Sequence, residues 1–347
     1  KRLFVSLFIC ITTTNFVIYM NQDSIQDSIK QLAANKQKLQ FGVFDGLINN
    51  TSTQQWDQSN QLLSPRRWHR KSWIFVGAYH PSIYVGFAIV DAGFLAKAFC
   101  YVYFPSTGKL IEHGIDRPFA FSKDFEANFN DSWKLGNYRI NNSNEQLSFS
   151  YASKKFSLSI KGKNTKQGLS FICPSIGTKR PFHFTYKNQL ISFDIRCEIN
   201  GKKLQFKTIP GSIDFSKGYP PKHTQWNWTS FMGQLEDGTP LGINVVDGFN
   251  NNMENVVWLG TERILIGPVC YQYKQPLEHS LWKVDALDGN LSLSMQGIGN
   301  RKEHINLRFL KSKFVQVFGS IQGRIRYQGN WKKFSGQGVM EEHEAIW

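Results

Sequence analysis

Hydrophobic and polar residues alternate with a period of two in several short segments of this chain. The clearest cases are residues 156–160, 291–295, 305–309 and 314–318. Because successive side chains of a strand point to opposite faces, each segment is expected to bury one face of a β-strand. Residues 73–79 and 84–90 are apolar on either side of a His-Pro-Ser turn, which predicts a hairpin.

Turn-forming residues separate the strand-like segments. Examples are Asp237-Gly238, Asp247-Gly248, Asp288-Gly289 and Gln328-Gly329-Asn330. No long segment with a helical period stands between consecutive strands, which disfavours alternating βαβ architecture. The pattern therefore predicts an all-β fold built from antiparallel barrels or sandwiches.

The strand pattern falls into two halves. Lys179-Arg180-Pro181 and Ile209-Pro210-Gly211 interrupt it near the middle of the chain. We predict one antiparallel β-barrel over residues 41–205 and a second over residues 206–347, because closing a sheet into a barrel removes exposed strand edges.

Residues 1–40 are predicted to lie outside the two barrels. From Asp23 to about residue 40, apolar positions at Ile25, Ile29, Leu32 and Leu39 predict a short amphipathic helix. Residues 1–11 combine two basic residues with an apolar run, as in a signal peptide, but no small-x-small cleavage site follows. Alternatively, Met20 is the natural start. A membrane-spanning helix is a third reading, disfavoured because residues 12–15 interrupt the apolar run.

The cysteines are odd in number and irregularly spaced. They are Cys10, Cys100, Cys173, Cys197 and Cys270, with no Cys-x-x-Cys pair. Such a set indicates neither a zinc site nor a disulfide framework, so we expect a reducing, cytoplasmic compartment. Export or membrane anchoring is the alternative if residues 1–19 are a signal segment.

Composition adds an aromatic and a basic character. The 28 Phe, 12 Tyr and 10 Trp favour strands and apolar ligands. The formal net charge is +15, but the basic pairs are scattered over many turns and strand ends. This distribution predicts a solvated surface and no nucleic-acid partner, and it supports binding to a membrane surface only weakly.

Several motifs in the second half carry a family resemblance. They are Asp214-x-x-Lys217-Gly218-Tyr219-Pro220, Trp226-Asn227-Trp228, Glu254-Asn255, Phe318-Gly319 and Gly338-x-x-Glu341-Glu342-His343. Together with Phe41–Gly46, Arg67-Trp68 and Phe184–Lys187, they resemble the family known as domain of unknown function 2804. Where that family usually has an arginine after the aspartate-led turn, this chain has Lys217.

The resemblance has implications for fold and function. The family is distantly similar to two-barrel, lipocalin-like proteins that include carotenoid hydratases and tocopherol cyclase. It therefore implies two tandem lipocalin-like barrels that hold an apolar molecule. Fold analogy of this kind supplies no residue-by-residue activity.

Acid-initiated chemistry on an apolar substrate needs a proton donor in a dry pocket and electron-rich ring faces. Asp214 and Glu254 are the candidate acids, because apolar surroundings raise the pKa of a carboxyl group. Tyr219 and His223 are the candidate proton relays. The ring faces expected in the ligand pocket are those of Trp226, Trp228, Trp258 and Tyr186.

Each candidate also has a purely structural interpretation. Asp214 can organise a turn, Glu254 can pair with a buried base, and tryptophans can simply fill a core. Glu341 and His343 share a strand face, but their position near the chain end favours a salt-bridged closing strand.

Two functions remain open at this point. The first is a protein that binds an apolar small molecule, such as a lipid or isoprenoid, in a β-barrel cavity. The second is an enzyme for hydration, isomerisation or cyclisation in the same cavity. No cofactor or metal is expected, since phosphate-binding, dinucleotide-binding and histidine-pair motifs are absent from the sequence. Oligomeric state stays undetermined.

Overall fold

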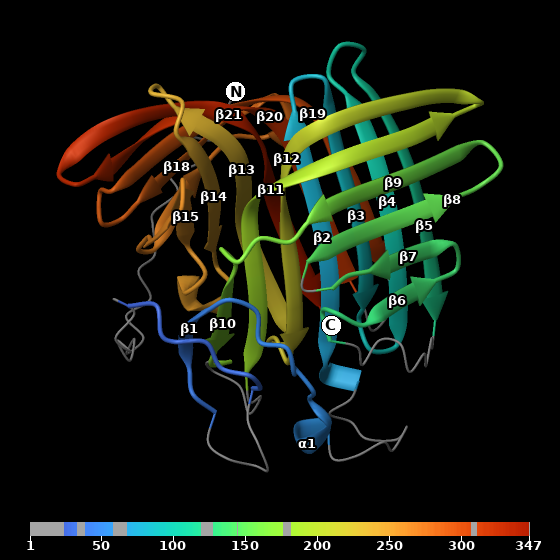
Figure 1. Cartoon of the computed structure of the whole chain (residues 1–347), viewed down its shortest axis with the longest axis horizontal. Coiled ribbons are helices and arrows are strands. Elements are labelled where there is room, and N and C mark those ends of the chain that lie inside the picture. Colours follow the sequence, from blue (N-terminus) through green and yellow to red (C-terminus); the bar gives the residue numbers. More distant parts are fainter. Residues whose placement is uncertain are drawn as a thin grey trace, which may run out of the picture.

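The structure, a computed structural model, describes residues 24–32, 39–57, 68–118, 128–143, 145–175, 182–306 and 311–346. Two large antiparallel sheets curl into two barrel-like units that lie side by side (Figure 1). The predicted all-β fold is confirmed. The named helical elements in the described part of the chain are short: α1 (Gln54–Asp57), η2 (Asn250–Asn252) and η3 (Leu277–His279).

The first unit is a 12-stranded sheet with the order β5-β4-β3-β2-β12-β11-β9-β8-β7-β6, to which β10 and then β1 are added beside β11. Its strands are β1 (Gly42–Asp45), β2 (Lys71–His80), β3 (Ile83–Asp91), β4 (Leu95–Phe104), β5 (Lys109–Pro118), β6 (Ser132–Leu135), β7 (Tyr138–Asn141), β8 (Gln146–Ala152), β9 (Phe156–Lys163), β10 (Leu169–Cys173), β11 (His183–Ile199) and β12 (Lys202–Gly218).

The second unit is a 9-stranded sheet with the order β16-β15-β14-β13-β21-β20-β19-β18-β17. Its strands are β13 (His223–Leu235), β14 (Pro240–Asp247), β15 (Val256–Leu259), β16 (Glu262–Leu265), β17 (Val269–Gln272), β18 (Leu281–Ala286), β19 (Leu291–Asn306), β20 (Lys311–Tyr327) and β21 (Asn330–Ile346). The chain passes from the first sheet to the second between Gly218 and His223, whereas the division predicted at residue 205 lies within β12.

The predicted N-terminal helix is wrong for the part that the structure describes. Residues 24–32 are extended, and the Gln26 amide donates a hydrogen bond to the Val43 carbonyl at 2.8 Å. Ile29 and Leu32 pack against the core of the first unit. Apolar residues at helical spacing can therefore also come from a segment whose backbone finds its partners in a distant strand. Residues 1–23, with the possible signal segment, lie outside the described residues.

The strands between the two units are buried on both faces. On β2, Ile74 and Val76 point into the core of the first unit, while Phe75 points towards Trp228 of the second unit. On β13, Phe231 belongs to the core of the second unit. Double burial explains why residues 73–79 are apolar almost throughout and do not alternate.

Phe318 of β20 lies at the centre of the contact between the units. Its ring packs against Tyr84, Tyr101 and Tyr103 of the first unit, with ring centroids 4.8 to 5.5 Å apart. The Tyr84 hydroxyl also donates a hydrogen bond to the Gly319 carbonyl at 3.0 Å. The two units thus share an apolar, aromatic interface in which the Tyr84 hydroxyl is hydrogen-bonded across the contact.

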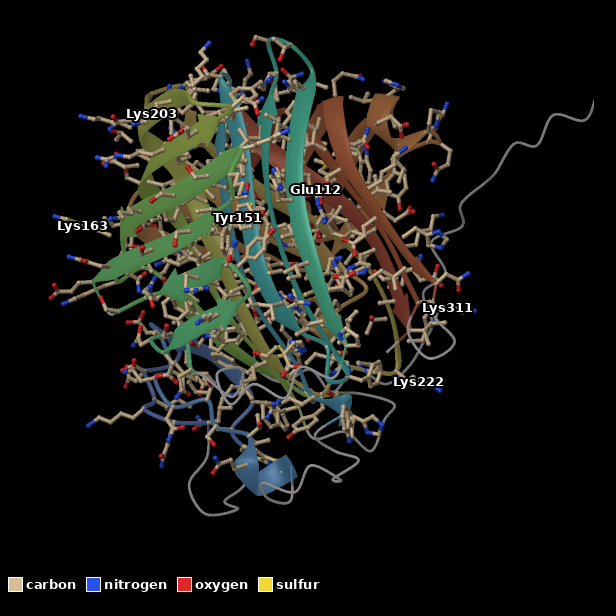
Figure 2. The ribbon with its side chains drawn as sticks, turned by 90° about the vertical axis from the view of Figure 1, so that its right-hand side faces the viewer. Glu112, Tyr151, Lys163, Lys203, Lys222 and Lys311 are labelled. Carbon is tan, nitrogen blue, oxygen red and sulfur yellow. The ribbon has the colours of Figure 1, made fainter. Side chains whose placement is uncertain are left out.

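Basic side chains are spread over the outside of both units. Lys163, Lys203, Lys222 and Lys311 are exposed and lie at different edges of the molecule in Figure 2. Cys100, Cys173 and Cys197 are buried free thiols. Within the described part of the chain, no helix has the length and apolar character needed to cross a bilayer.

Candidate functional site

A cavity of about 170 Å³ lies between the two units, with walls from both sheets. Its apolar lining includes the rings of Trp73, Phe75, Trp226, Trp228 and Phe249. An apolar cavity of about 150 Å³ is large enough to hold benzene, so this one has room for a ring-sized group. The sequence analysis predicted a cavity inside a barrel. This cavity lies between the two units instead, and core residues occupy the interiors of both units.

Strand register builds the first wall. Cross-strand pairing places the side chains of one row next to each other on β11, β12, β2, β3 and β4: Lys187, Asp214, Phe75, Ala88 and Phe99. Three of the four pairings, β11 with β12, β2 with β3 and β3 with β4, join consecutive strands, so short turns fix their register. The row changes from charged at β11 to aromatic at β4.

The second wall is a matching row from the other sheet. It runs over β14, β13, β21, β20 and β19 as Val246, Trp228, Glu341, Gln316 and Arg301. The next row on the same face holds Trp226, His343, Phe314 and Glu303. Long-range pairing of β13 with the C-terminal strand β21 therefore brings Trp228 beside Glu341.

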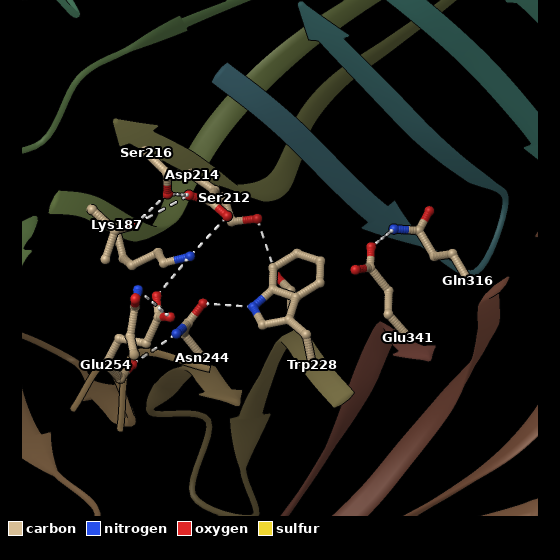
Figure 3. A network of polar contacts seen from close by, with 12 residues as sticks. Lys187, Ser212, Asp214, Ser216, Trp228, Asn244, Glu254, Gln316 and Glu341 are labelled. Carbon is tan, nitrogen blue, oxygen red and sulfur yellow. Dashed lines mark hydrogen bonds and ion pairs between the residues drawn. The ribbon is translucent and has the colours of Figure 1, made fainter. Parts of the chain in front are cut away.

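Lys187 forms a buried ion-pair cluster at one end of the cavity (Figure 3). Its Nζ lies 2.7 Å from Asp214 Oδ2 and 2.9 Å from Glu254 Oε2. Burial alone would lower the pKa of Lys187, but the two carboxylates outweigh it and raise the pKa to about 12. Burial raises the pKa of Glu254 even though Lys187 opposes the shift.

Glu341 is a buried carboxyl group in the middle of the second wall. Gln316 Nε2 donates a hydrogen bond to Glu341 Oε1 at 2.6 Å (Figure 3). The Tyr101 hydroxyl in turn donates to Gln316 Oε1. Burial, reinforced by the charge of Asp214, raises the pKa of Glu341 to about 8. At neutral pH the group is therefore a neutral acid.

The opposite end of the cavity carries paired charges. Arg301 Nε lies 2.6 Å from Glu112 and Arg301 Nη2 lies 2.8 Å from Glu303. Lys97 Nζ lies 2.7 Å from Glu303 and 3.0 Å from Asp116. Two of these pairs, Arg301–Glu112 and Lys97–Glu303, cross from one unit to the other, so they hold the walls together at this end.

His343 lies beside Trp226, with ring centroids 4.2 Å apart, and its Nε2 is 2.8 Å from Ser312 Oγ. Burial lowers the pKa of His343 to about 3, so the imidazole is neutral. A neutral imidazole in this position contributes a polar edge to the cavity without adding charge. In the part of the chain that the structure describes, no group of three or more His, Cys, Asp or Glu side chains is arranged to hold a metal ion.

Four of the eight residues singled out from the sequence line the cavity. Asp214, Glu254, Trp226 and Trp228 come together there from three separate parts of the chain. The Trp228 indole nitrogen donates to Asn244 Oδ1 at 2.9 Å, which fixes the plane of the ring.

Tyr186 and Trp258 lie in packed cores. Tyr186 is 1% exposed in the core of the first unit, and its hydroxyl accepts a hydrogen bond from Asn188. Trp258 is fully buried, and its indole nitrogen donates to the Gln167 carbonyl at 2.8 Å. Neither residue is among those that line the cavity between the units.

Tyr219 and His223 also lie away from the cavity lining. Tyr219 is buried against Phe182, with ring centroids 5.7 Å apart. His223 is exposed, and its Nε2 lies 2.9 Å from Glu344 Oε1 on the protein surface. Neither residue is positioned beside Asp214 or Glu254 as a proton relay.

The sequence analysis did not select Glu341, Lys187 or Arg301. The sequence did contain a signal for Glu341, because alternation along a strand places it on the same face as His343. In the structure both side chains line the cavity. Gln316 offered another, because it is the polar residue on the otherwise apolar Phe314 and Phe318 face of β20. Lys187 and Arg301 had no comparable local signal.

Two solved structures are similar in fold. Kievitone hydratase from Nectria haematococca superposes with a TM-score of 0.54 at 11% identity, over 86% of this chain and 97% of that chain. A protein provisionally named AttH from Nitrosomonas europaea superposes with a TM-score of 0.51 at 13% identity, over 79% of this chain and 92% of that chain. Both likenesses establish the two-barrel, lipocalin-like fold.

Among curated protein sequences, none matches this chain. A family model, described as Domain of unknown function (DUF2804), matches residues 45–347, which contain both walls of the cavity. The chain therefore belongs to the DUF2804 family.

Proposed function

We propose that this protein binds a small, largely apolar molecule in the cavity between its two units. The observation that carries the proposal is the aromatic lining, to which Trp73 and Phe75 of the first sheet and Trp226, Trp228 and Phe249 contribute. Aromatic walls with a few convergent polar groups are typical of small-molecule sites.

The fixed geometry of the rings supports this proposal. The hydrogen bond from Trp228 to Asn244 satisfies the indole nitrogen, and Asn244 in turn donates to the Glu254 carbonyl at 2.8 Å. Phe75 meets Trp228 edge-on, with ring centroids 5.9 Å apart. The site is thus formed before a ligand enters, so little ordering opposes binding.

Native mass spectrometry of protein purified from its own host tests the proposal. An apolar molecule should co-purify, and Trp228→Ala should weaken its retention by about 2 kcal/mol or more, as for a central aromatic contact. Trp331→Ala is the matched control, because Trp331 is 44% exposed and lies outside the cavity. Equal retention by both variants, with both folded by circular dichroism, would contradict the assignment.

A second candidate is an enzyme that protonates an alkene in this cavity, and Glu341 favours it. In that reaction the carboxyl O–H bond of Glu341 breaks as a C–H bond forms, which leaves a carboxylate beside a carbocation. Loss of another proton, ring closure or addition of water would then complete isomerisation, cyclisation or hydration. One protein of similar fold is itself a hydratase.

Deuterium uptake tests the second candidate. The co-purified molecule, returned to the protein in D₂O, should gain carbon-bound deuterium with the wild type and not with Glu341→Gln. Uptake that is unchanged in Glu341→Gln would exclude Glu341 as the proton donor and leave simple binding.

A further inference from the structure

Acidic groups outnumber basic groups around the cavity. Of the described residues that line it, the cations are Lys97, Lys187 and Arg301 and the acids are Asp214, Glu254, Glu303 and Glu341. Two further carboxylates, Glu112 and Asp116, pair with these cations from behind the wall. The acidic side chains around the cavity therefore outnumber the basic ones, and no surplus of positive charge is available for an anionic ligand.

The cations of the wall already have carboxylate partners. Arg301 contacts both Glu112 and Glu303, and Lys187 contacts both Asp214 and Glu254, all within 3 Å. An anionic ligand would have to displace one of these contacts and would meet the remaining carboxylates. The charge pattern thus disfavours anions.

The surplus acids lie next to ring faces that attract cations. Lys187 Nζ lies 5.9 Å from the Trp228 ring centroid, and Arg301 Cζ lies 4.0 Å from that of Phe99. Glu341 is the cross-strand neighbour of Trp228. An aromatic ring beside an acid with no cation in direct contact is the arrangement that recognises a substituted ammonium group.

We infer that the cavity accepts ligands whose positive charge is embedded in an apolar frame, such as substituted ammonium ions, with the charge placed between Trp228 and Glu341. This inference rests on the proposed function, because the same cavity must first admit an apolar molecule. It also deepens the second candidate, since a carbocation formed by proton transfer would occupy the same position beside the ionised Glu341.

The inference predicts a pH dependence, because Glu341 must ionise to pair with the cation. Charged and titratable groups from both units surround Glu341. From the first unit they are Tyr79 on β2, Tyr101 on β4 and Asp214 on β12. From the second unit they are Tyr271 on β17, Arg301 on β19 and His343, which is two residues further along β21. Burial keeps the pKa values of the three tyrosines above their usual range and the pKa of His343 at about 3. Glu341, with its pKa raised to about 8 by burial, is the group among them that changes charge between neutral and mildly alkaline pH.

A pair of isosteric probes tests the inference. Phenyltrimethylammonium and tert-butylbenzene have nearly the same shape and differ in charge. Binding is measured by tryptophan fluorescence at several pH values. The cation should bind up to about a hundredfold more tightly at about pH 9 than at about pH 6, because its affinity follows the ionisation of Glu341. The neutral probe should show no such rise.

Two variants make the test specific. Glu341→Gln should abolish the pH dependence of cation binding. Glu344→Gln is the matched control on the opposite face of β21, where Glu344 is exposed and pairs with His223, and it should behave as the wild type. Cation binding that is weaker than neutral binding at every pH would overturn the inference and leave the proposed function intact. Failure of both probes to bind would overturn both.

Discussion

At the scale of single residues, the acids of the cavity differ in what surrounds them. Asp214 and Glu254 share the ammonium group of Lys187, whereas Glu341 receives a hydrogen bond from the neutral amide of Gln316. An amide stabilises a carboxylate much less than an ammonium ion does. Burial therefore dominates at Glu341 and keeps it protonated at neutral pH.

The raised pKa of Glu341 predicts a pH-dependent stability. Between the ordinary value of 4.5 and about 8, the folded state binds one proton more than the unfolded state, so the stability due to this group is lost as the pH rises. The slope is at most about 1.4 kcal/mol per pH unit. Glu341→Gln should become more stable relative to the wild type from about pH 5 to about pH 9, as measured by urea unfolding.

Glu344→Gln provides the comparison for this prediction, because Glu344 is exposed on the same strand. Its difference from the wild type should stay flat over the same pH range. A flat difference for Glu341→Gln as well would show that Glu341 is ionised in the folded protein at neutral pH.

The sequence predicted the types of residue in the site better than their positions. Trp226 and Trp228 were expected on one face, and they line the cavity together. Trp258 is also a buried indole on a strand, but it belongs to a different apolar cluster, with Val43 and Phe171 of the first sheet, and does not line the cavity. Alternation shows which residues share a face of a strand, but it does not show which other sheet that face meets.

At the scale of secondary-structure elements, Lys187 links both units. It pairs with Asp214 across β11 and β12, and it reaches Glu254 in the segment between β14 and β15 of the other sheet. Lys187→Met would leave two carboxylates buried without a cation. We expect a loss of about 3–5 kcal/mol in the free energy of unfolding at neutral pH.

Urea unfolding of a second lysine variant sets the scale for that loss. Lys302 pairs with Glu278 at 2.8 Å, but its side chain is 51% exposed, so Lys302→Met should cost less than about 1 kcal/mol. Similar small losses in both variants would mean that the Lys187 cluster contributes little to holding the units together.

The elements themselves were predictable to different degrees. Residues 156–160 and 291–295 alternate because one side of β9 and of β19 is more exposed than the other. Residues 314–318 of β20 are buried on both sides, with Val317 in the core of the second unit and Phe318 in the interface. Residues 307–309 of the remaining alternating segment lie outside the described residues. The helix predicted around Ile29 was wrong. The apolar spacing of this segment fits a helix, but its backbone forms hydrogen bonds with the β1 region. Local pattern does not reveal a backbone partner that lies far along the chain.

At the scale of the whole molecule, the cavity exists because two curled sheets pack face to face. The contact combines an apolar centre around Phe318 with ion pairs at both ends of the cavity. The sequence predicted two barrels but gave no indication that the cavity would lie between them. Which faces of two separate sheets meet depends on the packing of the complete fold, which short-range periodicity does not encode.

Phe318→Ala tests whether this interface couples the two units. Its ring fills the space among three tyrosines, so its removal should leave a cavity and cost about 3–5 kcal/mol. Leu287→Ala, at a residue that is 63% exposed, should change stability by about 0.5 kcal/mol or less. Because Phe318 joins the units and belongs to neither interior core, its loss should also separate one unfolding transition into two in calorimetry. A single transition, shifted no further than that of Leu287→Ala, would show that the ion pairs alone hold the walls of the cavity in place.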